Sequence, residues 1–174
     1  MQPARREGNL LELKPLHKDA IPAALAKAER YRLLNEAWQA ESICQDVLRV
    51  DPENQTALVT LILALTDQFH QGLSVQEARD VIPRLRDPYE RAYYSGVICE
   101  RRAKTVLEQG RQGSAHTVYE SFREAMDWYE KAEAIRPPAN DDAILRWNTC
   151  ARFLARYPHV KPAAEERAEP VMLE

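Results

Sequence analysis

The feature that most constrains the fold is one recurring pattern: apolar residues at helical spacing, followed by Asp-Pro. The dipeptide occurs at 51–52 and again at 87–88, a separation of 36 residues. Proline disfavours helical geometry in the residue before it, so each Asp-Pro indicates the end of a helical unit. A repeat made of two helices and a turn has a period of roughly 34 residues. The spacing therefore predicts a chain of stacked helical pairs.

Amphipathic helices are expected in every interval between these breaks, because apolar residues recur there every three to four positions. The longest pair is expected from 89 to about 109 and from 114 to 135, around a glycine-containing turn. Pro83 is expected to end or distort a short helix. Residues that can cap helices precede five expected helices: Asp19, Asn54, Ser74, Ser114 and Asn140. No segment alternates at period two, so we expect an all-α fold without a sheet.

One helical domain is expected, flanked by two segments without regular structure. With 174 residues, of which 45% are hydrophobic and 29% charged, the chain has the length and balance of a single globular domain. Prolines, a glycine and charges mark residues 1–18 as a flexible leader. The Glu, Ala and Pro content of residues 158–174 indicates a mobile tail. Residues 19–157 form the predicted domain.

Charge, apolar runs and cysteines favour a cytoplasmic location. The net charge is −3 and the basic run at 101–104 is flanked by acidic residues, so no nucleic-acid partner is expected. The most apolar run, 57–65, is about half the length of a membrane span, so no membrane insertion is expected. The cysteines at 44, 99 and 150 are odd in number and lie among apolar neighbours, as buried thiols in a reducing compartment do.

The sequence offers no constellation that predicts catalysis. His116 and Glu120 lie one helical turn apart, but two ligands do not make a metal site and a solvated pair is favoured. Gly110 and Gly113 lack the lysine and the preceding strand of a phosphate-binding loop. The cysteines have no basic neighbours arranged to activate them. We therefore expect no catalytic residue, no metal site and no cofactor, and a protein that is not an enzyme.

Small and bulky residues recur at fixed positions in the helical pairs. The first unit carries Ala28, Tyr31, Ala40, Cys44, Val47 and Pro52, and the end of the third carries Ala125, Tyr129, Ala132 and Pro137. These residues resemble the tetratricopeptide repeat family, in which small residues let two helices approach and bulky ones fill the adjoining groove. The resemblance covers roughly residues 20–157. It implies a right-handed superhelical stack of about three helix–turn–helix units with a C-terminal capping helix.

The units depart from the family pattern in ways that predict their shapes. Ala78 lies two positions nearer the closing proline than the pattern asks, so the second helix of unit two is expected to be short. Gly96 and Ala125 are 29 residues apart where the family has about 12, so the third hairpin is expected to be elongated. The last unit supplies a single helix over 141–157.

The resemblance also implies a concave groove lined by the first helix of each unit, which receives a peptide or a helix of another protein. The implied groove residues are Leu25, Glu29, Arg32, Leu33, Val59, Leu63, Thr66, Asp67, Tyr93, Val97, Glu100, Arg101, Ile144, Asn148 and Arg152. An alternative interpretation is that the apolar members simply pack against neighbouring helices. A clamp for C-terminal carboxylates is not expected, because Glu29, Val59 and Leu63 occupy positions where it needs polar or basic groups.

The leading functional hypothesis is a non-enzymatic scaffold or adaptor that binds a peptide or helix of a partner protein in the groove, with Tyr93 and Arg152 as anchors. A homo-oligomeric structural module is the main alternative, with Tyr119, Phe122 and Trp128 of the long hairpin as its contact. An accessory subunit of an enzyme complex is compatible with the same sequence. An enzyme or an RNA-binding protein is the least favoured interpretation.

Overall fold

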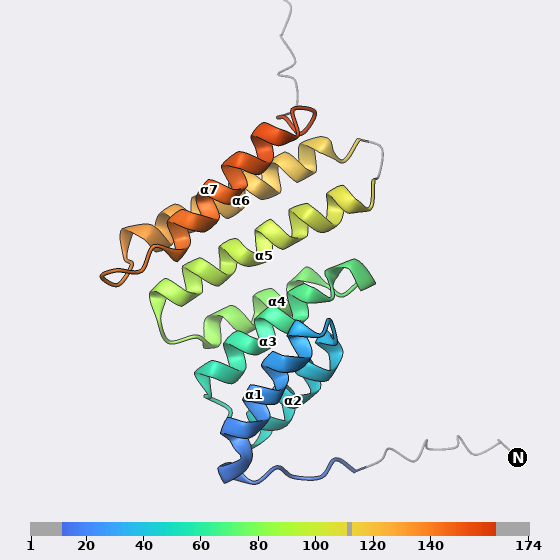
Figure 1. Cartoon of the computed structure of the whole chain (residues 1–174), viewed down its shortest axis with the longest axis vertical. Helices are drawn as coiled ribbons and strands as arrows, with labels where there is room; N and C mark the ends of the chain where they lie inside the picture. Colours follow the sequence, from blue (N-terminus) through green and yellow to red (C-terminus); the bar gives the residue numbers. More distant parts are fainter. Residues whose placement is uncertain (1–11, 111–112, 163–174) are drawn as a thin grey trace, which may run out of the picture.

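The computed structural model describes residues 12–110 and 113–162, and all regular secondary structure in these ranges is helical (Figure 1). The expectation of an all-α fold is therefore confirmed. The α-helices are α1 (Ile21–Leu33), α2 (Ala37–Val50), α3 (Gln55–Asp67), α4 (Val75–Val81), α5 (Pro88–Glu108), α6 (Ala115–Ala134) and α7 (Asp142–Arg156). Short 3-10 helices span Lys18–Ala20, Phe69–Gln71 and Ile82–Arg84.

Polar side chains fix the starts of several helices. The side chains of Asn54, Ser74 and Asp87 each accept a hydrogen bond from a backbone N–H two or three residues later. The side chain of Asn140 accepts a hydrogen bond from the N–H of Asp142 at 3.0 Å, within the first turn of α7. These bonds satisfy backbone donors that a helix start otherwise leaves free.

One predicted cap is wrong, and another has the predicted position without the capping bond. Asp19 lies inside the 3-10 turn that precedes α1, and α1 itself begins after Ala20. Ser114 does precede α6, but its side chain makes no capping hydrogen bond. Pro83 behaves as expected, because α4 ends at Val81 and the chain continues as a 3-10 turn.

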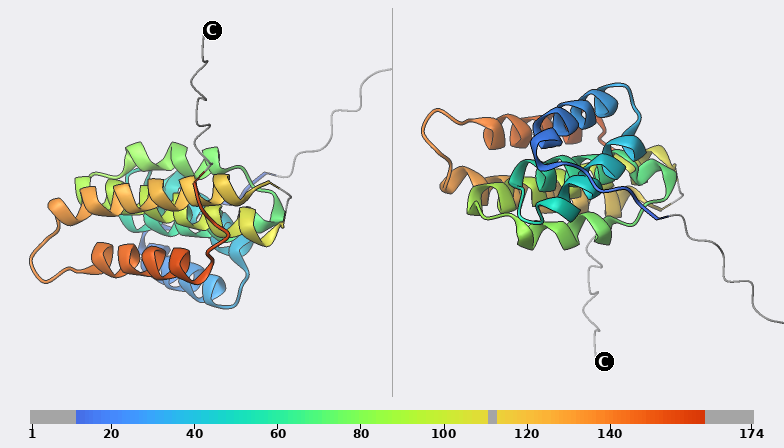
Figure 2. Two further views of the ribbon diagram at one scale, coloured as in Figure 1. Left: turned by 90° about the horizontal axis from the view of Figure 1, so that it is seen from above. Right: turned by 90° about the horizontal axis from the view of Figure 1, so that it is seen from below.

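The helices pack as neighbours along the chain. α1 packs against α2, α2 against α3, α5 against α6, and α6 against α7. α5 and α6 have 21 and 20 residues and form the longest pair, in line with the expected elongated hairpin. α4 has only 7 residues and contacts α3 and α5. Both views in Figure 2 show α1 and α7 on the same side of the molecule.

A close approach between α5 and α6 depends on Gly96. A Cβ atom at this position would lie 2.5 Å from Cε1 of Tyr129, nearer than real Cβ atoms come to other atoms. Tyr129 is fully buried and its hydroxyl donates to Glu100 at 2.7 Å, so its ring is held at both ends. The missing side chain of Gly96 therefore lets the long pair close around an aromatic ring.

The buried apolar residues form two main clusters, one in each half of the molecule. Leu58 and Ile62 of α3 are fully buried in one part, and Phe122 and Tyr129 of α6 in the other. Phe122 is therefore unavailable for the contact between copies that the sequence suggested. Val160, in the segment expected to be a tail, is also buried against α5–α7.

The three cysteines are buried, as expected. Burial, followed by the charge of Glu29, raises the pKa of Cys44 to about 12. Burial, followed by the charge of Glu124, raises the pKa of Cys99 to about 11. These thiols are protonated at neutral pH and serve as small apolar groups in the core.

Candidate binding face

One face of the molecule is built by α1, α3 and α5, which lie next to one another in that order. Residues three or four positions apart share one side of a helix, so each helix contributes a pair of neighbouring side chains to this surface. We call it the candidate face and define it by the members that the structure joins: Glu29 and Arg32 of α1, Thr60, Leu63, Thr66 and Asp67 of α3, and Arg101 of α5, with Leu33 at its edge.

Asp67 is the centre of the candidate face. Its carboxylate accepts a hydrogen bond from Nε of Arg32 at 2.9 Å and a second from Nη1 of Arg101. Arg101 also donates to Oγ1 of Thr66 at 2.7 Å and to the carbonyl oxygen of Leu63 at 3.3 Å. One carboxylate therefore links α1, α3 and α5.

A second acidic residue extends this network along α1. Oε1 of Glu29 accepts a hydrogen bond from the hydroxyl of Thr60 at 3.1 Å, and Oε2 lies 3.4 Å from Nη1 of Arg32. Only 14% of the Arg32 side chain is exposed, so its two ion pairs are partly shielded from solvent. An arginine that is shielded from solvent and paired with two carboxylates holds its geometry better than an isolated surface ion pair does.

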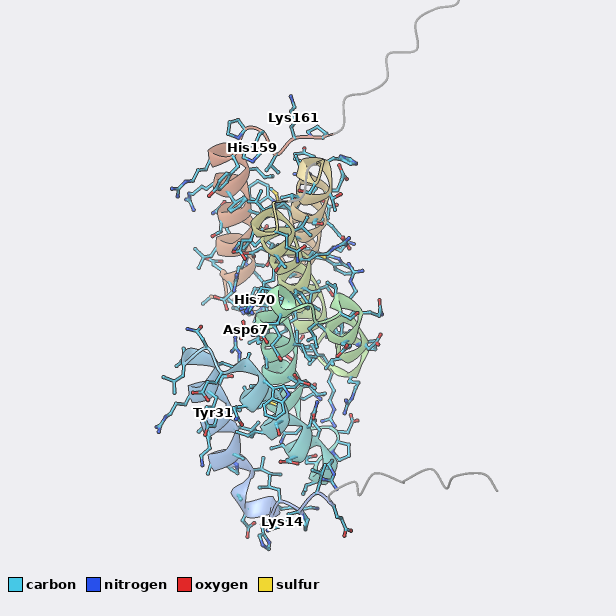
Figure 3. All side chains as sticks on the ribbon, turned by 90° about the vertical axis from the view of Figure 1, so that its right-hand side faces the viewer. Lys14, Tyr31, Asp67, His70, His159 and Lys161 are labelled. Carbon is cyan, nitrogen blue, oxygen red and sulfur yellow. The ribbon has the colours of Figure 1, made fainter. Side chains whose placement is uncertain are left out.

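Two hollows flank the Glu29–Arg32 pair. One, of about 310 Å³, lies between the α1–α2 turn and the end of α3, and Arg32, Asp67 and His70 line it. The other, of about 450 Å³, lies toward the start of α1, and Leu25 and Glu29 line it. Figure 3 shows Asp67 and His70 at a height between α1 below and α7 above.

The α1–α2 turn presents exposed apolar side chains beside the first hollow. Leu33 is 83% exposed, Leu34 58% and Trp38 65%, and Leu33 lines the hollow itself. Asn35 adopts a positive φ of 61° in this turn, so α1 ends and α2 begins within a few residues. Three large apolar side chains are thus exposed within six residues, a denser grouping than the scattered single residues normal for a surface, and we call Leu33, Leu34 and Trp38 the Leu33 patch.

Beyond Arg101, α5 carries a buried carboxylate. Glu100 is fully buried, and it accepts hydrogen bonds from Nζ of Lys104 at 2.5 Å and from the hydroxyl of Tyr129 at 2.7 Å. Nη1 of Arg146, from α7, lies 3.3 Å from each carboxylate oxygen. Burial raises the pKa of Glu100, but Lys104 and then Tyr129 and Arg146 outweigh it, so the pKa lies below its usual value. Glu100 is therefore ionised in the fold.

Several apolar residues of the implied groove belong to the core. Val97 is fully buried and Leu25 nearly so. Val59 and Leu63 are half-buried and pack on neighbouring core residues. These four residues therefore support the face from beneath, as the alternative packing interpretation holds.

Tyr93 is half-buried inside an aromatic cluster. Its ring centroid lies 5.8 Å from that of Tyr89, 5.1 Å from Tyr94 and 5.9 Å from Tyr129. These spacings are those of favourable aromatic pairs, which make the ring a structural element. The expected anchoring role of Tyr93 would have to use its partly exposed edge.

The α7 members of the implied groove are not joined to the candidate face. Ile144 and Asn148 are half-buried and Arg152 is exposed, and within the described ranges Asn148 and Arg152 make no hydrogen bond or ion pair with another side chain. Sequence reasoning missed Arg146, which reaches Glu100 instead. A signal was present, since Glu100 and Arg146 are opposite charges inside otherwise apolar helix faces.

The described part of the chain was found to lack two other kinds of feature. It contains no group of three or more His, Cys, Asp or Glu side chains placed to hold a metal ion. Nor does any of its helices combine the length and the apolar character needed to cross a membrane.

No protein-family model matches the chain, and a search among curated proteins likewise returned no match. The residues of the candidate face and the helices that position them are therefore the evidence on function.

Proposed function

We propose that the chain is a non-enzymatic scaffold or adaptor of the cytoplasm, built as a right-handed stack of tetratricopeptide-like helical pairs. Its partner is another protein, which lays a peptide or a helix on the candidate face. The observation that carries the proposal is the Asp67 network, because it joins α1, α3 and α5 through one carboxylate.

The candidate face combines features that suit a protein segment. The network fixes the backbone spacing of α1, α3 and α5 before any partner arrives, which lowers the ordering cost of binding. The hollows beside Glu29 and Arg32 offer recesses for side chains, and the Leu33 patch offers exposed apolar area. Interfaces with protein segments join apolar anchors to a polar rim in this way.

Site-specific photocrosslinking tests the proposal. A photoreactive phenylalanine analogue is placed at Leu33, which is exposed at the edge of the face, and in a second variant at Gln45, which is exposed on α2 away from it. After irradiation in the native cells, the Leu33 variant is expected to give a defined protein adduct that the Gln45 variant lacks. The adduct partner is then identified by mass spectrometry.

Binding by the purified partner completes the test. Leu33→Asp is expected to weaken its affinity by at least tenfold without lowering thermal stability, because Leu33 is almost fully solvent-exposed in the free protein. Equal adducts from Leu33 and Gln45, or unchanged affinity of the Leu33→Asp variant, would remove the candidate face as the binding surface.

Self-association is a second candidate function, and one observation favours it. Two adjoining hollows lie on the α4 side of the long hairpin, and both are lined by Ile82, Pro83, Ser95 and Trp128. They are open because α4, with 7 residues, is too short to cover this side of the hairpin. A second copy could cover them. Light scattering that shows only monomers at high protein concentration would remove this candidate.

A further inference from the structure

The buried acid Glu100, between α5 and α7, is held by more than one cation. Lys104 and Arg146 both hold Glu100, so two cations surround one carboxylate. The cationic side chains are 38% and 33% exposed, whereas Glu100 is fully buried. The cations therefore lie between the acid and the solvent, and this spot presents a net positive charge outward.

The rest of the candidate face is electrically balanced. Arg32 and Arg101 are two cations, and Glu29 and Asp67 are the two anions that they pair with. Among the residues joined by these ion pairs, the positive charge left over therefore lies at Lys104 and Arg146.

The positive spot continues the candidate face. Arg101 and Lys104 lie three positions apart on α5, which places them on one side of the helix. The strip then runs from the exposed Leu33 through the Asp67 network to Lys104 and Arg146, and each step along it is a side-chain contact, a shared hollow or a single helical turn. A segment lying along it would meet an apolar end and a cationic end.

We infer that the segment bound by the candidate face is acidic: its carboxylate side chains pair with Lys104 and Arg146, and its apolar side chains cover the Leu33 patch. This inference rests on the proposed function. Lys104 uses one of its three N–H donors on Glu100. Arg146 binds Glu100 through one of its guanidinium nitrogens and also bonds to Tyr93, which leaves further N–H groups among its five, so both side chains retain donors for a second carboxylate.

A carboxylate segment fits this charge better than a nucleic acid. The whole chain has a net charge of −3, and the spot holds two cations and no basic stripe. Exposed acidic residues, Glu108, Asp141 and Asp142, lie at the ends of α5 and α7. They would repel a long polyanion, which needs many cations to release its counterions.

Arrays of randomised peptides of equal length and equal apolar content test the inference. Three classes are compared, acidic, neutral and basic, together with a single-stranded oligonucleotide. The full chain is expected to retain acidic peptides preferentially, and their affinity, measured by fluorescence anisotropy, is expected to fall as salt is added.

Two variants change the charge of the spot in opposite directions. Lys104→Gln removes a cation and keeps an N–H donor for Glu100. It is expected to lower the affinity for acidic peptides about 3- to 10-fold. Glu100→Gln removes the buried anion and keeps an acceptor for Tyr129. It is expected to raise the affinity for acidic peptides. Structural damage could only weaken binding, so a gain separates electrostatics from misfolding. Arg49→Gln, at an exposed position of α2, removes one positive charge as Lys104→Gln does; it is the charge-matched control and is expected to leave affinity unchanged.

The outcomes separate the inference from the proposed function. If all three peptide classes bind equally and Leu33→Asp weakens each of them, the binding face stands and its acidic preference is overturned. If the oligonucleotide displaces the peptides, the partner class is overturned. If no peptide class binds, or if neither Leu33→Asp nor Lys104→Gln changes the affinity, both the proposed function and the inference are overturned. If the Glu100→Gln variant does not fold, the affinity of the Lys104→Gln variant and the salt dependence of binding decide whether the acidic preference holds.

Discussion

At the scale of single residues, the structure depends on two carboxylates that each serve more than one cation. Asp67 joins Arg32 and Arg101 across three helices, and Glu100 joins Lys104 and Arg146 across two. Removing the carboxylate from such a cluster leaves two cations facing each other, which costs more than the loss of one surface pair.

Asp67→Asn is the direct test of the first carboxylate. The amide keeps the volume but leaves Arg32 and Arg101 without their shared anion, so the free energy of unfolding is expected to fall by about 1–3 kcal/mol. Urea denaturation measures the change. Glu77→Gln, an exposed acid on α4, is the control and is expected to stay within about 0.5 kcal/mol of wild type. Equal losses in both variants would show that the network contributes nothing specific.

The second carboxylate makes stability depend on pH. The pKa of Glu100 is lowered in the fold, so its stabilising contribution is present above the ordinary value of 4.5 and is lost as pH falls through the lower folded value. The urea midpoint of wild type is expected to drop in this acidic range more steeply than that of Glu100→Gln. Identical pH profiles for the two proteins would contradict the assigned ionisation.

At the scale of helices, the sequence predicted which elements exist better than it predicted how they meet. Periodicity showed the buried faces, and Asn54 and Ser74 marked helix starts, because both signals are local. Periodicity does not say which helix covers a given face, so the approach of Arg146 to Glu100 was missed. The burial of Val160 was missed for the same reason, because the composition of the sequence around it does not differ from that of the rest of the expected tail.

The packing of α5 against α6 gives a prediction at this scale. Gly96→Ala adds helix propensity worth about 1 kcal/mol, whereas overpacking a core costs about 1–3 kcal/mol. Because Tyr129 is held by the core and by Glu100, we expect the upper part of that cost and a net loss of about 1–2 kcal/mol. Ser95→Ala on the same helix is the control in chemical denaturation. A Gly96→Ala variant as stable as its control would mean that the ring can move.

At the scale of the whole molecule, the candidate face was predicted only in part. The family resemblance implied both partners of the Asp67–Arg101 contact, because groove positions recur in each unit. It also implied Leu25 and Val97, which are buried. The difference is physical: the resemblance states which helix side faces the groove, whereas burial depends on how tightly the neighbouring helix lies against it. The exposed Leu33 patch lies where α1 ends and α2 begins within a few residues, around Asn35.

The most direct test of the account is a map of amide chemical shifts. The full chain, labelled with nitrogen-15, is titrated with the partner segment from the crosslinking experiment. Shifts centred on Leu33, Asp67 and Lys104, with little change at Arg49 on α2, are the expected result. Shifts centred on Trp128 and the α4–α6 side would contradict the claim that α1, α3 and α5 form the binding face.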